Sequence, residues 1–383
     1  MVQNRIPLIL LGLLTWALIV ASVASPIDFR SFYAAGELLR AHPAALYSLP
    51  AQQAAQHATG STVFLPWAHL AIEALLFAPL SLLTWRHAYS VWTALSIGLL
   101  LVAGALLRED VRPLRPVDRL ALAAAVFVPA MIGLLIGQDH ALVLLLWVLA
   151  WRKWRDGHRF AAGVFIGISL IRYQFAIPFL LCLLVLRKWE TLRGALLSGT
   201  SMLLASWLLV GSNMIPSYLR LLRMLAASDT AAVQRMPTIR GFANLILPVH
   251  ADIAAGVAIA ILMVWALIAI RRLDDAGAFA FAMIVSLLAD FHGFRQDLTL
   301  LAIRASVLLR KSSRFAVLLW CVVPLNLIGA FVFKAPALMC PVLLAWAVWA
   351  ARFSIARETP RQQNEQSPDP LPQDSSLPIT VQR

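Results

Sequence analysis

Long apolar segments recur along almost the whole of this chain and restrict the folds open to it. Hydrophobic residues make up 61% of the 383 positions and charged residues only 13%, about half of the roughly 25% that soluble domains carry. Because about 20 apolar residues span a bilayer, the sequence predicts an all-α polytopic membrane protein with about 11–13 transmembrane or re-entrant helices. The runs at or near membrane length occupy residues 6–24, 64–84, 87–107, 120–136, 140–151, 160–171, 174–186, 195–211, 253–270, 276–290, 297–309, 315–333 and 336–352.

Basic clusters between these runs set the expected orientation, because Lys and Arg concentrate on the cytoplasmic side of a membrane. Residues 25–62 and 212–250 then lie outside, and we expect juxtamembrane helices there. The four arginines of 108–119 conflict with two full crossings between residues 64 and 107. Either one of those runs does not cross, or the pair at 120–151 is a re-entrant hairpin. The basic clusters are RKWRDGHR (152–159), RKWE (187–190), RRLDD (271–275) and RKSSR (310–314).

The chain divides into one membrane domain, residues 1–352, and a polar, proline-rich tail, residues 353–383, predicted to be disordered and cytoplasmic. The run at 6–24 is longer than the core of a signal peptide, so an uncleaved first transmembrane helix is expected, although Val23-Ala24-Ser25 resembles a cleavage site. The net charge of +13 comes from basic clusters between the apolar runs, which we expect to set the membrane topology and to contact lipid head groups, not to bind nucleic acid.

Four polar groups interrupt or flank the apolar runs, and ionisable residues at such positions are costly enough to be functional hypotheses. The groups are Asp28 with Arg30, Tyr33 and Glu37; Gln138, Asp139 and His140 in GQDH; Arg172 in SLIRYQF; and Asp290, His292, Arg295 and Asp297 in ADFHGFRQD.

Three of these groups also have a plainer interpretation. Asp28 is a suitable cap for a helix that begins near Phe29, and GQDH fits a solvated turn. Arg172 either pairs with a phosphate or carboxylate, which suits its forked guanidinium, or marks a break between two half-helices. The fourth group is least like an ordinary turn, since turns favour Gly, Asn, Ser and Pro.

Two weaker features remain. Pro66, Trp67 and His69 begin the second apolar run, with Glu73 inside it, and Arg240 and Asn244 lie in the loop 212–250. The sequence contains no phosphate-binding loop, dinucleotide fingerprint, H-E-x-x-H or C-x-x-C. ATP-driven transport, dinucleotide chemistry and zinc proteolysis are therefore not supported.

The order of these motifs resembles the GT-C superfamily of integral-membrane glycosyltransferases, and most closely glycosyltransferase family 87. The resemblance rests on Asp28-Phe29 followed by Phe32-Tyr33-Ala34-Ala35-Gly36, Leu46-Tyr47, Phe64-Leu65-Pro66, Gly137-Gln138, AAGVFIGISLIRYQ (161–174), TIRGFANLI and FHGFRQDLTLL. Trp67 stands where the family has a second proline, Arg172 where it often has lysine and Tyr173 where proline is common. Asp139-His140 is unusual after the Gly-Gln pair.

This resemblance implies an inverting transfer, on the external face of the plasma (inner) membrane, of a sugar such as mannose. The implied donor is a polyprenyl-phosphate sugar, and the acceptor is a lipid or glycan. The aspartate that opens the first external loop, here Asp28, is the implied general base. Arg172, Arg295 and His292 would bind the donor phosphate. Further substrate-binding candidates are Tyr33, Gln138, His140, Arg240 and Asp297.

No cofactor is implied, and no metal is required where arginines bind the phosphate, although some superfamily members use one. The carboxylates of Asp290 and Asp297 keep that option open. A lipid or small-solute transporter with charges along its pathway is the alternative function. It predicts charge on several helices at mid-membrane and an inverted repeat. A non-catalytic relative also fits the sequence.

Overall fold

The computed structural model describes residues 26–226, 233–312, 314–329, 332 and 335–355, and within these ranges all regular secondary structure is helical. The expected first span, 6–24, and nearly all of the expected tail lie outside the described residues. Helix α17 (Met339–Ile355) runs a few residues into the range assigned to the tail.

Six helical segments in the described ranges are long and apolar enough to cross a membrane, which confirms a polytopic all-α membrane protein. The apolar runs 160–171 and 174–186 form one segment of spanning length, although they were expected as two elements. The six segments are α5 (Trp85–Val111), α6 (Pro116–Ile136), α8–η4–α9 (Arg159–Val185), α10 (Trp189–Val210), Pro248–Arg272 containing α13 (Ala251–Ala269), and Ala335–Arg352 at α17.

The second apolar run does not form a span. It folds into the short helix α4 (Ala71–Phe77) and the turn η3 (Leu80–Leu82). Helix α4 packs tightly against α2 (Ile27–Ala41): a Cβ on Gly36 would lie 2.5 Å from the carbonyl carbon of Phe77. The first crossing after the 25–62 loop is therefore α5, which takes residues 108–119 to the opposite end of the molecule. Of the two topologies that the sequence allowed, the structure has the one in which a run between residues 64 and 107 does not cross.

Ion pairs join the basic clusters at this opposite end, here called the basic end. Buried Asp110, in the last turn of α5, lies 3.2 Å from Arg155 at the end of α7 (His140–Arg155) and 3.2 Å from Arg310 of α15 (Leu301–Lys311). Lys188 lies 2.7 Å from Asp275, which begins α14 (Asp275–Ala289), and Arg159 pairs with the same carboxylate. These contacts place 108–119, 152–159, 187–190, 271–275 and 310–314 on one side, as the basic clusters require.

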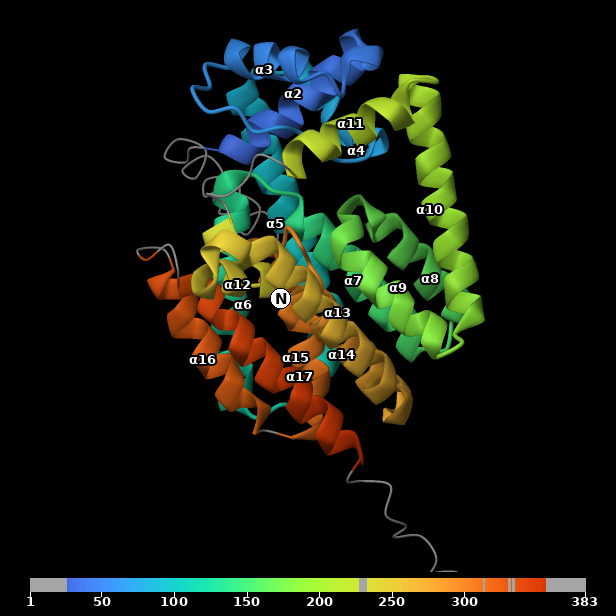
Figure 1. Cartoon of the computed structure of the whole chain (residues 1–383), viewed down its shortest axis with the longest axis vertical. Coiled ribbons are helices and arrows are strands. Elements are labelled where there is room, and N and C mark those ends of the chain that lie inside the picture. Colours follow the sequence, from blue (N-terminus) through green and yellow to red (C-terminus); the bar gives the residue numbers. More distant parts are fainter. Residues whose placement is uncertain (1–25, 227–232, 313, 330–331, 333–334, 356–383) are drawn as a thin grey trace, which may run out of the picture.

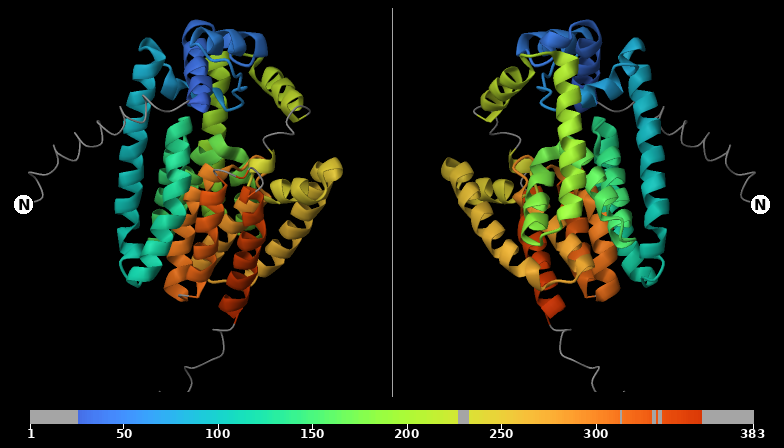
Figure 2. Two further views of the ribbon diagram at one scale, coloured as in Figure 1. Left: turned by 90° about the vertical axis from the view of Figure 1, so that its left-hand side faces the viewer. Right: turned by 90° about the vertical axis from the view of Figure 1, so that its right-hand side faces the viewer.

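Short helices form a layer over the other end, here called the cap: α2, η2 (Pro43–Ala45), α3 (Leu49–Ala58), α4 and α11 (Met214–Ala226) (Figure 1). Aromatic side chains hold it together, with the rings of Phe32 and Phe77 4.8 Å apart and that of Phe77 4.6 Å from Trp92 of α5. Figure 2 shows this layer above the long helices in two further views. The short helices predicted for the two loops are thus present.

Helix α14 lies at the centre of the bundle, and all of its residues from Gly277 to Ala289 are buried. In the five longer spans fewer than half of the residues are buried, which suits contact with lipid. Around α14 stand α9 (Tyr173–Val185), α13, α15, α17 and the turn η8 (Arg295–Leu300), while α16 (Phe315–Ile328) packs on α6 and α17 and α12 (Ile239–Ile246) packs on α13.

Candidate active site

Asp28 reaches across the fold and does not cap its own helix. Helix α2 begins at Ile27, its N-cap is Pro26, and no side chain caps it. The half-buried Asp28 carboxylate instead accepts a hydrogen bond through Oδ2 from Nε2 of Gln138, 110 positions away in the sequence. The capping interpretation of Asp28 is therefore wrong.

A glycine turn makes this contact between α2 and the α6–α7 turn sterically feasible. Gly137 has φ +77°, in the left-handed region where glycine alone is unstrained. A Cβ on Gly137 would lie 2.4 Å from Cβ of Phe29, so the two backbones meet only because none is present. Tyr89 fixes the same turn by donating from its hydroxyl to the Leu134 carbonyl oxygen at 2.9 Å.

Arg172 lies in a helix break and also has a carboxylate partner, so both interpretations of it apply. The 3₁₀ turn η4 (Ser169–Arg172) separates α8 (Arg159–Ile168) from α9. From there, Nε of Arg172 donates to both carboxylate oxygens of Asp139 at 3.1 and 3.2 Å. Its Nη2 donates to Asp139 Oδ1 and to Oε1 of Gln138.

Gln138 therefore couples the base candidate to the buried ion pair. Its amide oxygen accepts from Arg172 and its amide nitrogen donates to Asp28, so a single amide orientation satisfies both partners. The result is a continuous chain from Asp28 through Gln138 to Arg172 and Asp139, built from α2, the α6–α7 turn and η4.

The two carboxylates of this chain differ in basicity. Burial raises the pKa of Asp28, opposed in part by the hydrogen bond from Gln138 and by the charge of Arg172. Burial also favours a higher pKa for Asp139, but Arg172 outweighs it and brings the pKa to about 2. Asp139 is therefore held as an anion, whereas Asp28 is the stronger base.

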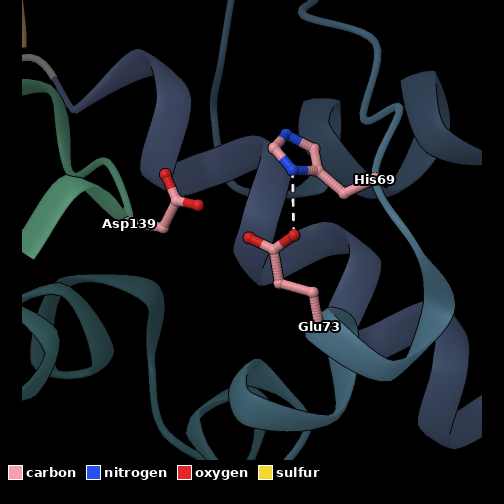
Figure 3. A group of neighbouring side chains, drawn as sticks. All are labelled: His69, Glu73 and Asp139. Atoms are coloured by element: carbon pink, nitrogen blue, oxygen red, sulfur yellow. Dashed lines mark ion pairs between the residues drawn. The ribbon is translucent and has the colours of Figure 1, made fainter. Parts of the chain in front are cut away.

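His69 and Glu73 complete one wall of the site, although neither was among the site residues predicted from the sequence. Figure 3 shows them facing Asp139. Nδ1 of His69 is 2.9 Å from Oε2 of Glu73, and the potential ligand atoms of the three residues lie within 4.8 Å of one another. Burial raises the pKa of Glu73. The available signal was a carboxylate inside an apolar run, four residues after a histidine.

The late polar turn reaches the same region through its acidic residues. The carboxylate of Asp297 accepts from the Phe294 backbone N–H at 2.7 Å and interacts electrostatically with Arg172, Asp139 and Asp28. Asp290 accepts from the backbone N–H of His292 at 2.8 Å, and its own charge also interacts with Arg172.

Arg295 in this turn lies near a second arginine. Burial lowers the pKa of Arg295, and the positive charge of Arg235 in η5 (Val233–Arg235) lowers it further. Nη1 of Arg295 is buried with no acceptor among the described residues. Two arginine side chains this close to each other favour an anion between them. Arg235 was missed because a single arginine in the loop 212–250 carries no signal of its own.

Three predicted substrate-binding residues have other contacts. The Tyr33 hydroxyl donates to the Leu83 carbonyl oxygen at 2.8 Å. His140 packs so closely on α6 that a Cβ on Gly133 would touch its ring. Arg240 lies 2.8 Å from Asp252 and donates to the Phe291 carbonyl oxygen at 3.3 Å, which ties α12 to α13 and the late turn. Their roles in substrate binding stay predictions.

The comparison with known families agrees with this architecture. Residues 71–292 match the family model for glycosyltransferase family 87, which is more than half of the chain. The chain therefore belongs to glycosyltransferase family 87 and is a membrane glycosyltransferase, an enzyme that uses a sugar donor and an acceptor. No curated protein and no solved structure matches it significantly. The matched range contains Glu73, Asp139 and Arg172, while Asp28 and Asp297 lie outside it.

Proposed function

We propose that this enzyme transfers a sugar, with mannose the first candidate, from a polyprenyl-phosphate donor to a lipid or glycan hydroxyl, with inversion and with Asp28 as the general base. The observation that carries the proposal is the chain from Asp28 through Gln138 to the buried Arg172–Asp139 pair. It holds the Asp28 carboxylate of the cap helix α2 at a fixed place against the α6–α7 turn.

In the proposed reaction, Asp28 accepts the proton of the acceptor hydroxyl while the hydroxyl oxygen bonds to the anomeric carbon. The bond from that carbon to the donor phosphate oxygen breaks on the opposite face of the sugar, which inverts its configuration. A polyprenyl phosphate leaves with one additional negative charge. A carboxylate whose pKa burial has raised is suited to the proton transfer.

Cationic groups near the late turn suit the leaving phosphate. Arg295 and Arg235 lie close together, and Nη1 of Arg295 has no acceptor among the described residues. Arg172 uses Nε and Nη2 to hold Asp139 and Gln138, and Nη1 takes no part in those bonds. We assign the phosphate to Arg295 first, with His292 beside it, and to the remaining edge of Arg172.

The distribution of charge favours an active site on the external face. Asp28, Arg172 and the late turn gather at the cap end, and the basic clusters are paired at the other end. Since basic clusters remain cytoplasmic, the cap would face the outside, or the periplasm, of the plasma membrane. Family membership favours a transferase over the transporter that the sequence left open.

The test is Asp28→Asn in membranes supplied with polyprenyl-phosphate sugars and a range of acceptors. Asn keeps the shape of the side chain and can still accept from Gln138, so only the proton acceptor is lost. We expect turnover to fall by about 10²- to 10⁴-fold. Glu37→Gln, which changes a carboxylate on the same helix, is the matched control and should keep wild-type turnover. Equal turnover in Asp28→Asn and wild type would exclude Asp28 as the base.

A further inference from the structure

The wall formed by His69, Glu73 and Asp139 has buried polar atoms with unused bonding capacity. Glu73 is 1% exposed, and Nδ1 of His69 lies 2.9 Å from its Oε2. The other carboxylate oxygen of Glu73, Oε1, is buried with no hydrogen-bond donor among the described residues. A buried carboxylate oxygen without a donor is costly, so this atom calls for a partner.

The surrounding charge specifies the kind of partner. Carboxylates of Asp28, Glu73, Asp139 and Asp297 interact with one another or with Arg172, the single permanent cation among these interacting groups. An excess of negative charge beneath an apolar cap favours a positive ligand. An anion bound at the wall of His69, Glu73 and Asp139 would increase this excess, whereas the donor phosphate is assigned to Arg295 and to the other edge of Arg172.

We propose that His69, Glu73 and Asp139 bind a divalent first-row cation of the Mn²⁺ or Zn²⁺ class. One imidazole and two carboxylates form a donor set that such cations accept. Bonds of about 2.0–2.2 Å place ligand atoms roughly 3–4 Å apart. The three ligand atoms already lie within 4.8 Å of one another, so small side-chain rotations would complete the site.

The cation and the Arg172–Asp139 pair are compatible. Each carboxylate offers about four lone-pair positions, so Asp139 can accept from Arg172 and still coordinate a cation. The remaining coordination positions are left for water or substrate. This proposal departs from the expectation of no metal, and its ligands differ from the Asp290 and Asp297 pair that the sequence kept as an option.

The full chain in nanodiscs of zwitterionic lipid, stripped with a chelator, is titrated with Mn²⁺ alone, and free Mn²⁺ is followed by electron paramagnetic resonance. We expect one Mn²⁺ per chain, displaced by Zn²⁺. Glu73→Gln and His69→Gln should each weaken binding by at least about ten-fold, since even changes beyond the ligands themselves cost that much. Glu190→Gln, at an exposed carboxylate in the first turn of α10, should leave it unchanged.

The outcomes separate this site from the proposed reaction. Asp28→Asn should keep Mn²⁺ binding while losing turnover, so a failure of either proposal is visible by itself. His69→Gln keeps the test valid if Glu73→Gln does not fold, because His69 is only partly buried. No stoichiometric Mn²⁺ in the wild type, or equal binding in His69→Gln, would overturn the proposal.

Discussion

Gly137→Ala tests whether the close approach of α2 to the α6–α7 turn positions the catalytic groups. The added Cβ would lie 2.4 Å from Cβ of Phe29 and 3.2 Å from the Tyr89 ring. Carbon atoms pack at about 3.5–4.0 Å, so α2 must move away by about 1 Å or more. Asp28 is the residue before Phe29, and its bond to Gln138 would be lost or lengthened.

The expected loss has two parts. A 1 Å misplacement of a reacting group costs about 10²-fold in rate, which is roughly 2.7 kcal/mol of activation free energy. Placing an alanine at φ +77° adds about 1–2 kcal/mol of backbone strain, which lowers the free energy of unfolding. We therefore expect turnover to fall by about two orders of magnitude, together with a modest fall in thermal stability.

Gly60→Ala is the matched control for this experiment. Gly60 has φ +78°, almost the same as Gly137, but a Cβ added to it would meet nothing within 4 Å. It should therefore show only the part of the stability loss that comes from backbone strain, and it should keep wild-type turnover. Turnover and thermal unfolding are measured on the same purified samples of both variants. If Gly137→Ala transfers sugar as fast as Gly60→Ala, the close approach does not position the proposed base, Asp28.

Three further predictions concern charged residues. Arg172→Lys should lower turnover at least ten-fold, because one ammonium cannot reproduce the bonds to both Asp139 and Gln138; turnover per folded protein measures this. Burial raises the pKa of Asp290 to about 7, so its folded state retains a proton that an unfolded chain releases near pH 4, and stability should fall as pH rises from about 4 to 7. Asp290→Asn should reduce that slope, which is measured by thermal unfolding at pH 5 and pH 8. Asp110→Asn should lower the free energy of unfolding by about 1–3 kcal/mol, because the buried acceptor of Arg155 and Arg310 loses its charge while both arginines stay partly exposed to solvent, without changing turnover per folded protein.

The sequence predicted the class of fold but not which apolar runs cross. Composition cannot separate a span from a helix buried in a cap, because both are apolar. The run 64–84 belongs to the cap because its helical part is only Ala71–Phe77 and Gly36 lets it pack on α2. The conflict at 108–119 was the one sequence signal of this, and the observed fold resolves it.

The chemistry of the site was predictable by residue type, whereas its contacts were not. Asp28, Gln138 and Arg172 were selected because polar groups in apolar surroundings need partners. That Gln138 is the partner of both others depends on contacts across 110 and 34 positions, which spacing along one chain does not specify. Tyr33 illustrates the limit, because a residue five positions from Asp28 on a helix points to a different side and bonds to Leu83.

The position of the site follows from the constraint that a membrane places on backbone. Lipid-exposed segments must remain helical because every backbone polar group needs a partner, so irregular backbone is tolerated only where protein covers it. The α6–α7 turn, the break η4 and the late turn before η8 are three such places, and each supplies a polar side chain to one layer. The cap shields that layer, and the buried pair of Arg172 and Asp139 balances charge within it. Polar side chains of the candidate site are therefore expected where the helices are interrupted. For this reason the motifs appear in the sequence as interruptions of apolar runs.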